Sequence, residues 1–267
     1  MRPTDAPLSE WTASRLARAL ARRFQAVPHQ IAWSLAANGF AGLKTRVQAF
    51  KDLHRGERCF ILGNGPSLAG MDLEPLRTEF TFGLNRVFVD FSRMGFMTTY
   101  LVSIDELVAR QSAVELASLP MPKFLNWMIR NCLAPGDNVI WLRESFRRHF
   151  SVDLLKGLWG GATVTYAALQ VAYYMGFQQV LLIGVDHSYT QQGTPHEPVV
   201  SPGNDPDHFH PDYYPSGFRW HRPDTRTAEA AYRMAQQAFE HDGREILDAT
   251  VGGKLPVFRK ADYSRLF

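Results

Sequence analysis

The first candidate site is a glycine turn formed by Gly63, Asn64, Gly65, Pro66 and Ser67. The turn follows a short apolar run at residues 59–62 that favours a strand, and Ser67 is a residue type common at helix N-caps. A strand, a glycine turn and a helix start can hold phosphate, because backbone N–H groups approach the anion and the helix N-terminus adds positive potential. An ordinary tight turn fits the same pattern, since the third glycine of the dinucleotide fingerprint is missing. The side-chain donors of Asn64 and Ser67 favour a site for nucleotide phosphate or ribose.

Three more polar residues directly follow apolar runs: Asn85, Asp105 and Asp186. Ligands in parallel α/β folds bind beyond the carboxyl ends of the strands, so we expect these side chains to lie near the glycine turn. An aspartate there can bind a ribose hydroxyl or a metal, or it can cap the next turn. Thr163 follows a second glycine pair, and it can donate to a phosphate or cap the helix that begins there.

Residues 190–224 are rich in Pro, Gly, His, Asp and aromatic side chains. A structureless loop of this length in a compact domain is usually functional, often as a lid. Its aromatic residues and Arg219 suit stacking on a base or sugar and pairing with a phosphate. Histidine has an ordinary pKa close to neutral, which makes His221 the first candidate for a general base and His210 its rival. The pair of His208 and His210 beside three aspartates is a weaker candidate for metal ligation, and we predict no metal site.

Apolar runs alternate with helical patterns from residue 59 onward. Strands are predicted at residues 59–62, 80–84, 100–104, 123–127, 138–142, 180–185 and 245–248, and helices at 71–79, 106–116, 163–175 and 227–241. Strands separated by helices indicate an α/β, Rossmann-like fold, with a mostly parallel sheet covered by helices on both faces. The uncharged stretch 157–185 is long enough to span a bilayer, but glycines and glutamines interrupt it, which indicates a buried helix, a turn and a strand.

Residues 1–58 form a basic arm before the first predicted strand. They carry ten Lys or Arg and four acidic residues, a net charge of +6, whereas the whole chain carries +3. Apolar residues recur at helical spacing between the arginines: Trp11, Leu16, Leu20, Phe24, Val27 and Ile31. Such a helix can lie on an anionic membrane surface, or it can pack on its own domain with a solvated basic face. We therefore divide the chain into an arm at 1–58 and a nucleotide-binding catalytic domain at 59–267, with a lid at 190–224.

The composition is that of a globular protein, with 45% hydrophobic and 21% charged residues in a chain of 267. The two cysteines lie far apart, and Cys59 falls within the first predicted strand. We expect no disulfide framework, and a reducing cytoplasm fits. The first residues are polar and mixed in charge, so no signal peptide is visible. The small net charge does not argue for a nucleic acid partner.

Three motifs in order carry a resemblance to known proteins: Ile61-Leu-Gly-Asn-Gly-Pro-Ser-Leu68, then Leu84-Asn85, then Gly176-Phe-x-x-Val-x-Leu-Ile-Gly-Val-Asp186. In this order they resemble the family 42 sialyltransferases and their relatives, the motility-associated flagellin glycosyltransferases and the archaeal-type 6-hydroxymethylpterin diphosphokinases. The resemblance covers about residues 59–249 and implies a Rossmann-like fold that binds a nucleotide through the first turn. In the sialyltransferases, the turn and the later Asn hold a CMP-sugar, lid tyrosines stabilise the leaving phosphate, and a lid histidine is the general base.

The same resemblance assigns roles to lid residues of this chain. The family's His-x-x-x-Thr pattern before a long helix resembles His221 and Thr225, which implies that His221 is the base. The chain departs from the family at Asp105, where the family has Asn, and its closing 248–253 segment looks more like the kinase-related branch. The tyrosine role has three candidates: Tyr189, Tyr213 and Tyr214.

Two enzyme classes remain open beside a nucleotide-binding module without catalysis. The first is a glycosyltransferase that moves a sialic-acid-like or related sugar from a nucleotide-activated, most simply CMP-linked, donor to a glycan or other hydroxyl acceptor, with no cofactor required. The second is an ATP-dependent 6-hydroxymethylpterin diphosphokinase-like enzyme, which needs Mg²⁺ that Asp105 and Asp186 could hold. We expect a cytoplasmic protein, with the inner membrane surface as a candidate partner of the arm and a homo-oligomer left open.

Overall fold

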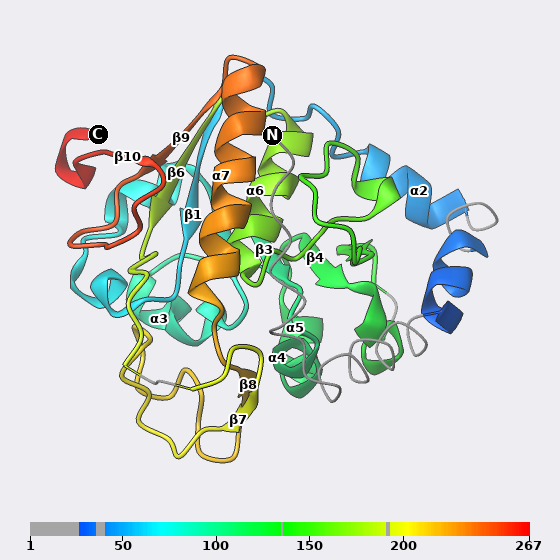
Figure 1. The fold of residues 1–267 in the computed structure, drawn as a ribbon, viewed down its shortest axis with the longest axis horizontal. Helices are drawn as coiled ribbons and strands as arrows, with labels where there is room; N and C mark the ends of the chain where they lie inside the picture. Colours follow the sequence, from blue (N-terminus) through cyan, green and yellow to red (C-terminus); the bar gives the residue numbers. More distant parts are fainter. Residues whose placement is uncertain (1–26, 36–40, 135, 191–192) are drawn as a thin grey trace, which may run out of the picture.

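Eight parallel strands form the central sheet of the protein (Figure 1). The computed structural model describes residues 27–35, 41–134, 136–190 and 193–267. The spatial order of the strands is β10-β9-β6-β1-β2-β3-β4-β5, and every neighbouring pair is parallel. Their bounds are β1 Arg58–Leu62, β2 Phe80–Leu84, β3 Tyr100–Ser103, β4 Lys123–Asn126, β5 Val139–Leu142, β6 Gln179–Ile183, β9 Glu245–Asp248 and β10 Arg259–Lys260. The predicted α/β, Rossmann-like fold with a mostly parallel sheet is confirmed.

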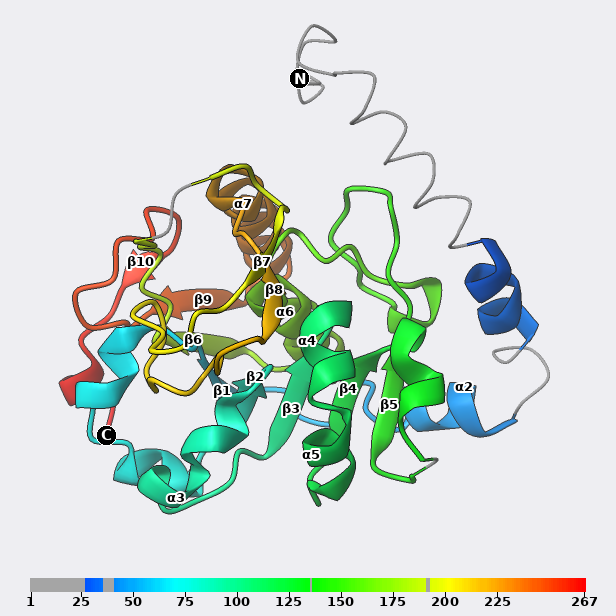
Figure 2. The same ribbon diagram turned by 90° about the horizontal axis from the view of Figure 1, so that it is seen from below.

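Helices cover both faces of this sheet (Figure 2). The helices are α6 (Val164–Met175) and α7 (Thr225–His241) on one face, and α3 (Phe91–Met94), α4 (Glu106–Gln111) and α5 (Ala113–Ser118) on the other. Alternate residues of β1 explain this arrangement. Cys59 and Ile61 belong to the core under α6 and α7, whereas Phe60 and Leu62 belong to the opposite core, and all four are fully buried.

The order in which the chain adds strands to the sheet reverses between β1 and β6. The chain places β2 to β5 in order on one side of β1, and then returns to place β6, β9 and β10 on the other side. In open α/β sheets the crevice at such a switch point, beyond the carboxyl ends of the strands, is the usual ligand site. The glycine turn after β1 and Asp186 after β6 flank this point, as the sequence predicts.

Three helical predictions differ from the structure. The helix expected at 71–79 is a short 3₁₀ helix at Glu74–Thr78, with a proline in its first turn. The single helix expected at 106–116 is two helices, α4 and α5, which meet at Ser112. Serine is neutral to unfavourable in a helix interior and is favoured at helix ends, and here its hydroxyl accepts from Arg86 Nη1 at 3.1 Å. The glycine turn leads into a 3₁₀ turn at Pro66–Gly70 and not into an α-helix. Gly65 occupies its N-cap position, because Pro66 starts the turn, so the prediction that Ser67 caps a helix is wrong.

Residues 193–224 form a packed cap (yellow in Figure 1), within the stretch 190–224 where the sequence indicated a structureless loop. Within it β7 (Pro198–Val200) and β8 (Arg219–His221) pair antiparallel as a separate two-stranded sheet. Strands of three residues are too short to give a visible period in the sequence. The aromatic side chains of the cap are buried and join the core under α3 to α5: Phe209, Tyr213, Tyr214, Phe218 and Trp220.

The N-terminal part lies beside the β5 edge of the sheet (Figure 2). α2 (Ala41–Gln48) packs against β5 and contributes Val47 to the main core. Residues 27–35 are helical, and Trp33 packs edge-on against Trp127 with ring centroids 5.3 Å apart. Most of the predicted amphipathic stretch, residues 1–26, lies outside the described residues. None of the helices described has the length and apolar composition needed to cross a membrane.

Candidate functional site at the carboxyl edge of the sheet

The turn after β1 is tied to the loop after β6. Gly63 and Gly65 donate their backbone N–H groups to carbonyl oxygens at and just beyond the end of β6, at 2.7 and 2.8 Å. Asp186 accepts hydrogen bonds from the backbone N–H of Ser67 at 3.2 Å and from its hydroxyl at 2.8 Å. The two glycine N–H groups are therefore engaged by the sheet and not open to a phosphate. Asp186 therefore holds the turn after β1, a partner different from the next turn that the sequence offered as one of its alternatives.

Asn64 and Asn85 lie at the ends of neighbouring strands. Asn64 donates from Nδ2 to the Leu84 carbonyl at 3.2 Å, but its buried Oδ1 has no hydrogen-bond partner among the described residues. Asn85 adopts a left-handed conformation, with φ of 47°, and its Oδ1 accepts from the Ser103 hydroxyl at 3.1 Å. The cap closes over this point, since the Phe209 N–H donates to the Asn64 carbonyl at 2.9 Å. An unpartnered buried amide oxygen here is an acceptor for a ligand's amine or hydroxyl.

The three candidate tyrosines have different surroundings. Tyr213 is fully buried, and its hydroxyl accepts from the Arg86 N–H at 3.4 Å, beside Asn85. Burial raises the pKa of the Tyr213 phenol, which keeps it a hydrogen-bond donor. Tyr214 is stacked inside the aromatic cluster of the cap. Tyr189 keeps 43% of its residue surface exposed, but burial around the phenol raises the pKa of its hydroxyl.

His221 and Asp105, which are 116 residues apart in the chain, meet at the start of α4. His221 Nδ1 lies 3.2 Å from Asp105 Oδ2, and the two side chains are 31% and 27% exposed. The other oxygen, Oδ1, accepts from the N–H groups of Leu107 at 2.8 Å and Val108 at 3.2 Å and so caps α4. His221 Nε2 has no hydrogen-bond partner among the described residues. A histidine oriented by a carboxylate, with its second nitrogen open, is the arrangement of a general base.

Arg219 shares a face of β8 with His221. The two residues are two positions apart in the strand, so their side chains project to the same side, about 7 Å apart along the chain. Trp220 between them is buried on the opposite side. Gln111 of α4 holds this strand, since its Nε2 donates to the Arg219 carbonyl at 2.7 Å and its Oε1 accepts from the Arg219 N–H at 2.9 Å. The exposed side chain of Arg219 therefore starts from the same face of β8 as the candidate base.

Thr163 and His210 have local roles. The Thr163 hydroxyl accepts from the Thr165 N–H at 3.3 Å and so caps α6, which is the simpler of its two expected roles. His210 Nδ1 accepts from the Asp212 N–H at 3.1 Å within a turn of the cap. Neither contact joins these side chains to the His221 pair.

Sequence reasoning missed two contributors to this edge. Gln111 holds β8, as described above, and Glu229 of α7 lies 3.1 Å from His187, which follows Asp186. Both residues are on helices, where a polar side chain usually faces solvent, and no local pattern distinguishes them. A second histidine–carboxylate pair lies within the cap, with His208 Nδ1 2.7 Å from Asp205 Oδ2.

The described residues contain no group of three His, Cys, Asp or Glu side chains placed to hold a metal ion. Asp105 follows β3 and Asp186 follows β6, with β1 and β2 between them, which separates the two by about 14 Å at the usual strand spacing. Their carboxylates also accept the hydrogen bonds described above. The pair therefore does not fit a single Mg²⁺ ion held between them, the arrangement that the diphosphokinase alternative would use.

Comparisons with known proteins bear on the fold of this site. No family model matches the chain, and neither does any curated protein. Among solved structures, the chain is similar to the MAf glycosyltransferase from Magnetospirillum magneticum AMB-1, with a TM-score of 0.51 and 15% sequence identity over 96% of the chain. The chain spans 43% of the length of that protein. At this identity, the likeness shows that the two proteins share a fold.

Proposed function

We propose that this chain is a glycosyltransferase that moves a sugar from a nucleotide-activated donor to a hydroxyl acceptor. The observation that carries the proposal is the His221–Asp105 pair, with the imidazole Nε2 unpartnered and Arg219 on the same face of β8. The fold shared with a glycosyltransferase supports it. The turn motif's resemblance to family 42 sialyltransferases favours a CMP-linked, sialic-acid-like donor and a glycan or small-molecule acceptor.

The chemistry follows from the side chains on this face. His221 Nε2 takes the proton of the acceptor hydroxyl as its oxygen attacks the anomeric carbon of the donor sugar. The bond from that carbon to the phosphate oxygen breaks, and the phosphate leaves with the bonding electrons. Arg219 stabilises the negative charge that develops on the leaving phosphate, and Tyr189 supplies a further donor. The proposal requires no bound cofactor.

The nucleotide would bind at the switch point of the sheet. Asn64 Oδ1 is the open acceptor there, suited to a base amine or a ribose hydroxyl. Asn85 and the Tyr213 hydroxyl line the neighbouring strand end. Ser67 fixes the shape of the turn instead of contributing free donors, because its N–H and hydroxyl both donate to Asp186.

Thermal unfolding with CMP, CDP, UDP and ATP, each with and without Mg²⁺, tests the nucleotide site. A nucleotide at 100 times its Kd adds about 2.7 kcal/mol to the free energy of unfolding. We expect CMP to stabilise the protein without Mg²⁺. In a separate transfer assay, we expect the protein to release CMP from a CMP-sugar when an acceptor is present. Stabilisation by ATP with Mg²⁺ alone would favour the diphosphokinase alternative. No stabilisation by any nucleotide would contradict the proposed donor class.

A further inference from the structure

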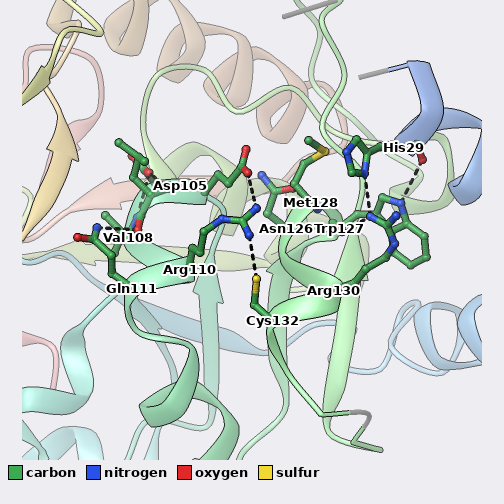
Figure 3. Close-up of polar contacts among 12 residues, drawn as sticks. His29, Asp105, Val108, Arg110, Gln111, Asn126, Trp127, Met128, Arg130 and Cys132 are labelled. Atoms are coloured by element: carbon green, nitrogen blue, oxygen red, sulfur yellow. Dashed lines mark hydrogen bonds and ion pairs between the residues drawn. The ribbon is translucent and has the colours of Figure 1, made fainter. Parts of the chain in front are cut away.

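Asp105 uses its two carboxylate oxygens for different tasks. Oδ1 accepts from the first N–H groups of α4, as Figure 3 shows for Val108, and Oδ2 faces His221. This N-capping contact fixes the Asp105 carboxylate rigidly to α4, because two backbone N–H groups of the helix hold one of its oxygens. The direction of Oδ2 is therefore set by α4 and not by the cap segment that carries His221.

This direction determines the tautomer of His221. An ionised carboxylate only accepts hydrogen bonds, so the nitrogen that faces it must carry the proton. With the proton on Nδ1, the lone pair of Nε2 is free to accept another. The opposite tautomer would carry its proton on Nε2 and could not act as a base from that atom.

We propose that Asp105 is a positioning residue, which holds His221 in the tautomer that leaves Nε2 as the base. This inference rests on the proposed function. It also implies that the base is complete only while β8 is docked on α4, since the imidazole comes from the cap and the carboxylate from the sheet edge. Two contacts hold that docking: Gln111 binds the backbone of Arg219, and the Arg86 guanidinium lies 4.7 Å from the centroid of the Phe218 ring.

The substitution Asp105→Asn separates positioning from helix capping. Asn caps helices about as well as Asp, so α4 keeps its cap through the amide oxygen. The amide NH₂ then faces His221 Nδ1 and donates to it, which moves the imidazole proton to Nε2. Asp105→Ser provides a second variant, because Ser also caps a helix but leaves Nδ1 without a carboxylate.

The chain contains a matched control at the start of α7. Asp224 caps that helix through the Thr227 N–H at 2.9 Å, and its other oxygen lies 3.2 Å from His196 Nε2. Asp224→Asn therefore makes the same change of charge and helix cap, at a carboxylate whose histidine partner is His196 and not His221.

The experiment combines ¹⁵N-histidine NMR of the free protein with transfer kinetics. The His221 signal is assigned by its loss in His221→Gln. We expect Nδ1–H in the unchanged protein and Nε2–H in Asp105→Asn, with kcat lower by about 10²–10⁴-fold and KM nearly unchanged. Asp105→Ser should also lower kcat, and Asp224→Asn should keep both the tautomer and the rate.

Each result decides one question. A His221 tautomer that stays the same in Asp105→Asn overturns the positioning role, whatever the protein transfers. A changed tautomer with an unchanged kcat also overturns it, because the base would then not depend on that proton. If the unchanged protein transfers no sugar from any donor while the tautomer shifts as expected, the proposed function fails and the effect of Asp105 on His221 stands.

Discussion

At the scale of single residues, position 65 requires a glycine because a side chain there would collide with neighbouring atoms of the protein. A Cβ at this position would stand 1.9 Å from Asp186 Oδ2, and the backbone φ of −72° is one that any residue adopts. Gly65→Ala should therefore lower the free energy of unfolding by about 1–3 kcal/mol, through steric conflict with Asp186 and with the Gly184 carbonyl oxygen, 2.8 Å from the added Cβ. Urea denaturation measures this. Gly70→Ala is the control, because a Cβ there meets nothing within 4 Å, and equal stability of the two variants would contradict the explanation.

The sequence identified many of the individual residues but not their partners. His221 and Asp105 were each candidates, one as a base and the other as a nucleotide ligand, and only the fold brings them to 3.2 Å. Asp186 was a candidate ligand, yet its hydrogen bonds to Ser67 depend on the pairing of β1 with β6. Pairings across long separations in the chain are not encoded in local spacing, so residue types could indicate chemistry but not contacts.

At the scale of elements, the strands were the most predictable part. The predictions at 80–84 and 245–248 match β2 and β9, whose buried apolar and β-branched side chains favour a strand. The cap was the least predictable. Its two strands are short, and its order depends on aromatic packing against α3 to α5, which no local pattern reports.

The contact between β8 and α4 leads to a second prediction. Gln111→Ala removes the acceptor for the Arg219 N–H, a hydrogen bond worth about 0.5–1.5 kcal/mol, so exchange of that amide hydrogen should become roughly 2- to 12-fold faster. Hydrogen exchange followed by NMR provides the readout. Gln236→Ala, which removes only an exposed side-chain contact on α7, should leave the Arg219 amide unchanged. Exchange that is equally slow in both variants would mean that Gln111 does not hold the cap.

At the scale of the whole molecule, the N-terminal part presents an apolar stripe. His29 binds Trp127 and Arg130 (Figure 3), and Trp33 is buried, which fixes the side of residues 27–35 that faces the domain. Val27, Ile31 and Leu35 recur every four residues, and they are 46%, 56% and 66% exposed. Together with the +6 charge of residues 1–58, this stripe fits an anionic membrane surface.

Vesicle sedimentation tests that expectation. We expect the chain to bind vesicles containing phosphatidylserine more strongly than pure phosphatidylcholine, less so at high salt, and to lose most binding in Ile31→Gln/Leu35→Gln. Val114→Gln on α5, an apolar position that is 83% exposed and far from the arm in sequence, is the control and should bind normally. If vesicle binding depends neither on the lipid charge nor on Ile31 and Leu35, the membrane expectation is wrong, and the remaining alternative is that the arm packs on its own domain.

The central claim is that His221 is the base of a glycosyl transfer, and His221→Ala tests it most directly. Donor affinity from calorimetry and the single-turnover transfer rate are measured on the same protein, with His210→Ala as the comparison. We predict donor affinity close to normal for both variants. The transfer rate should fall by about 10²–10⁴-fold in His221→Ala and stay near normal in His210→Ala. A His221→Ala protein that transfers sugar at the normal rate would contradict the claim.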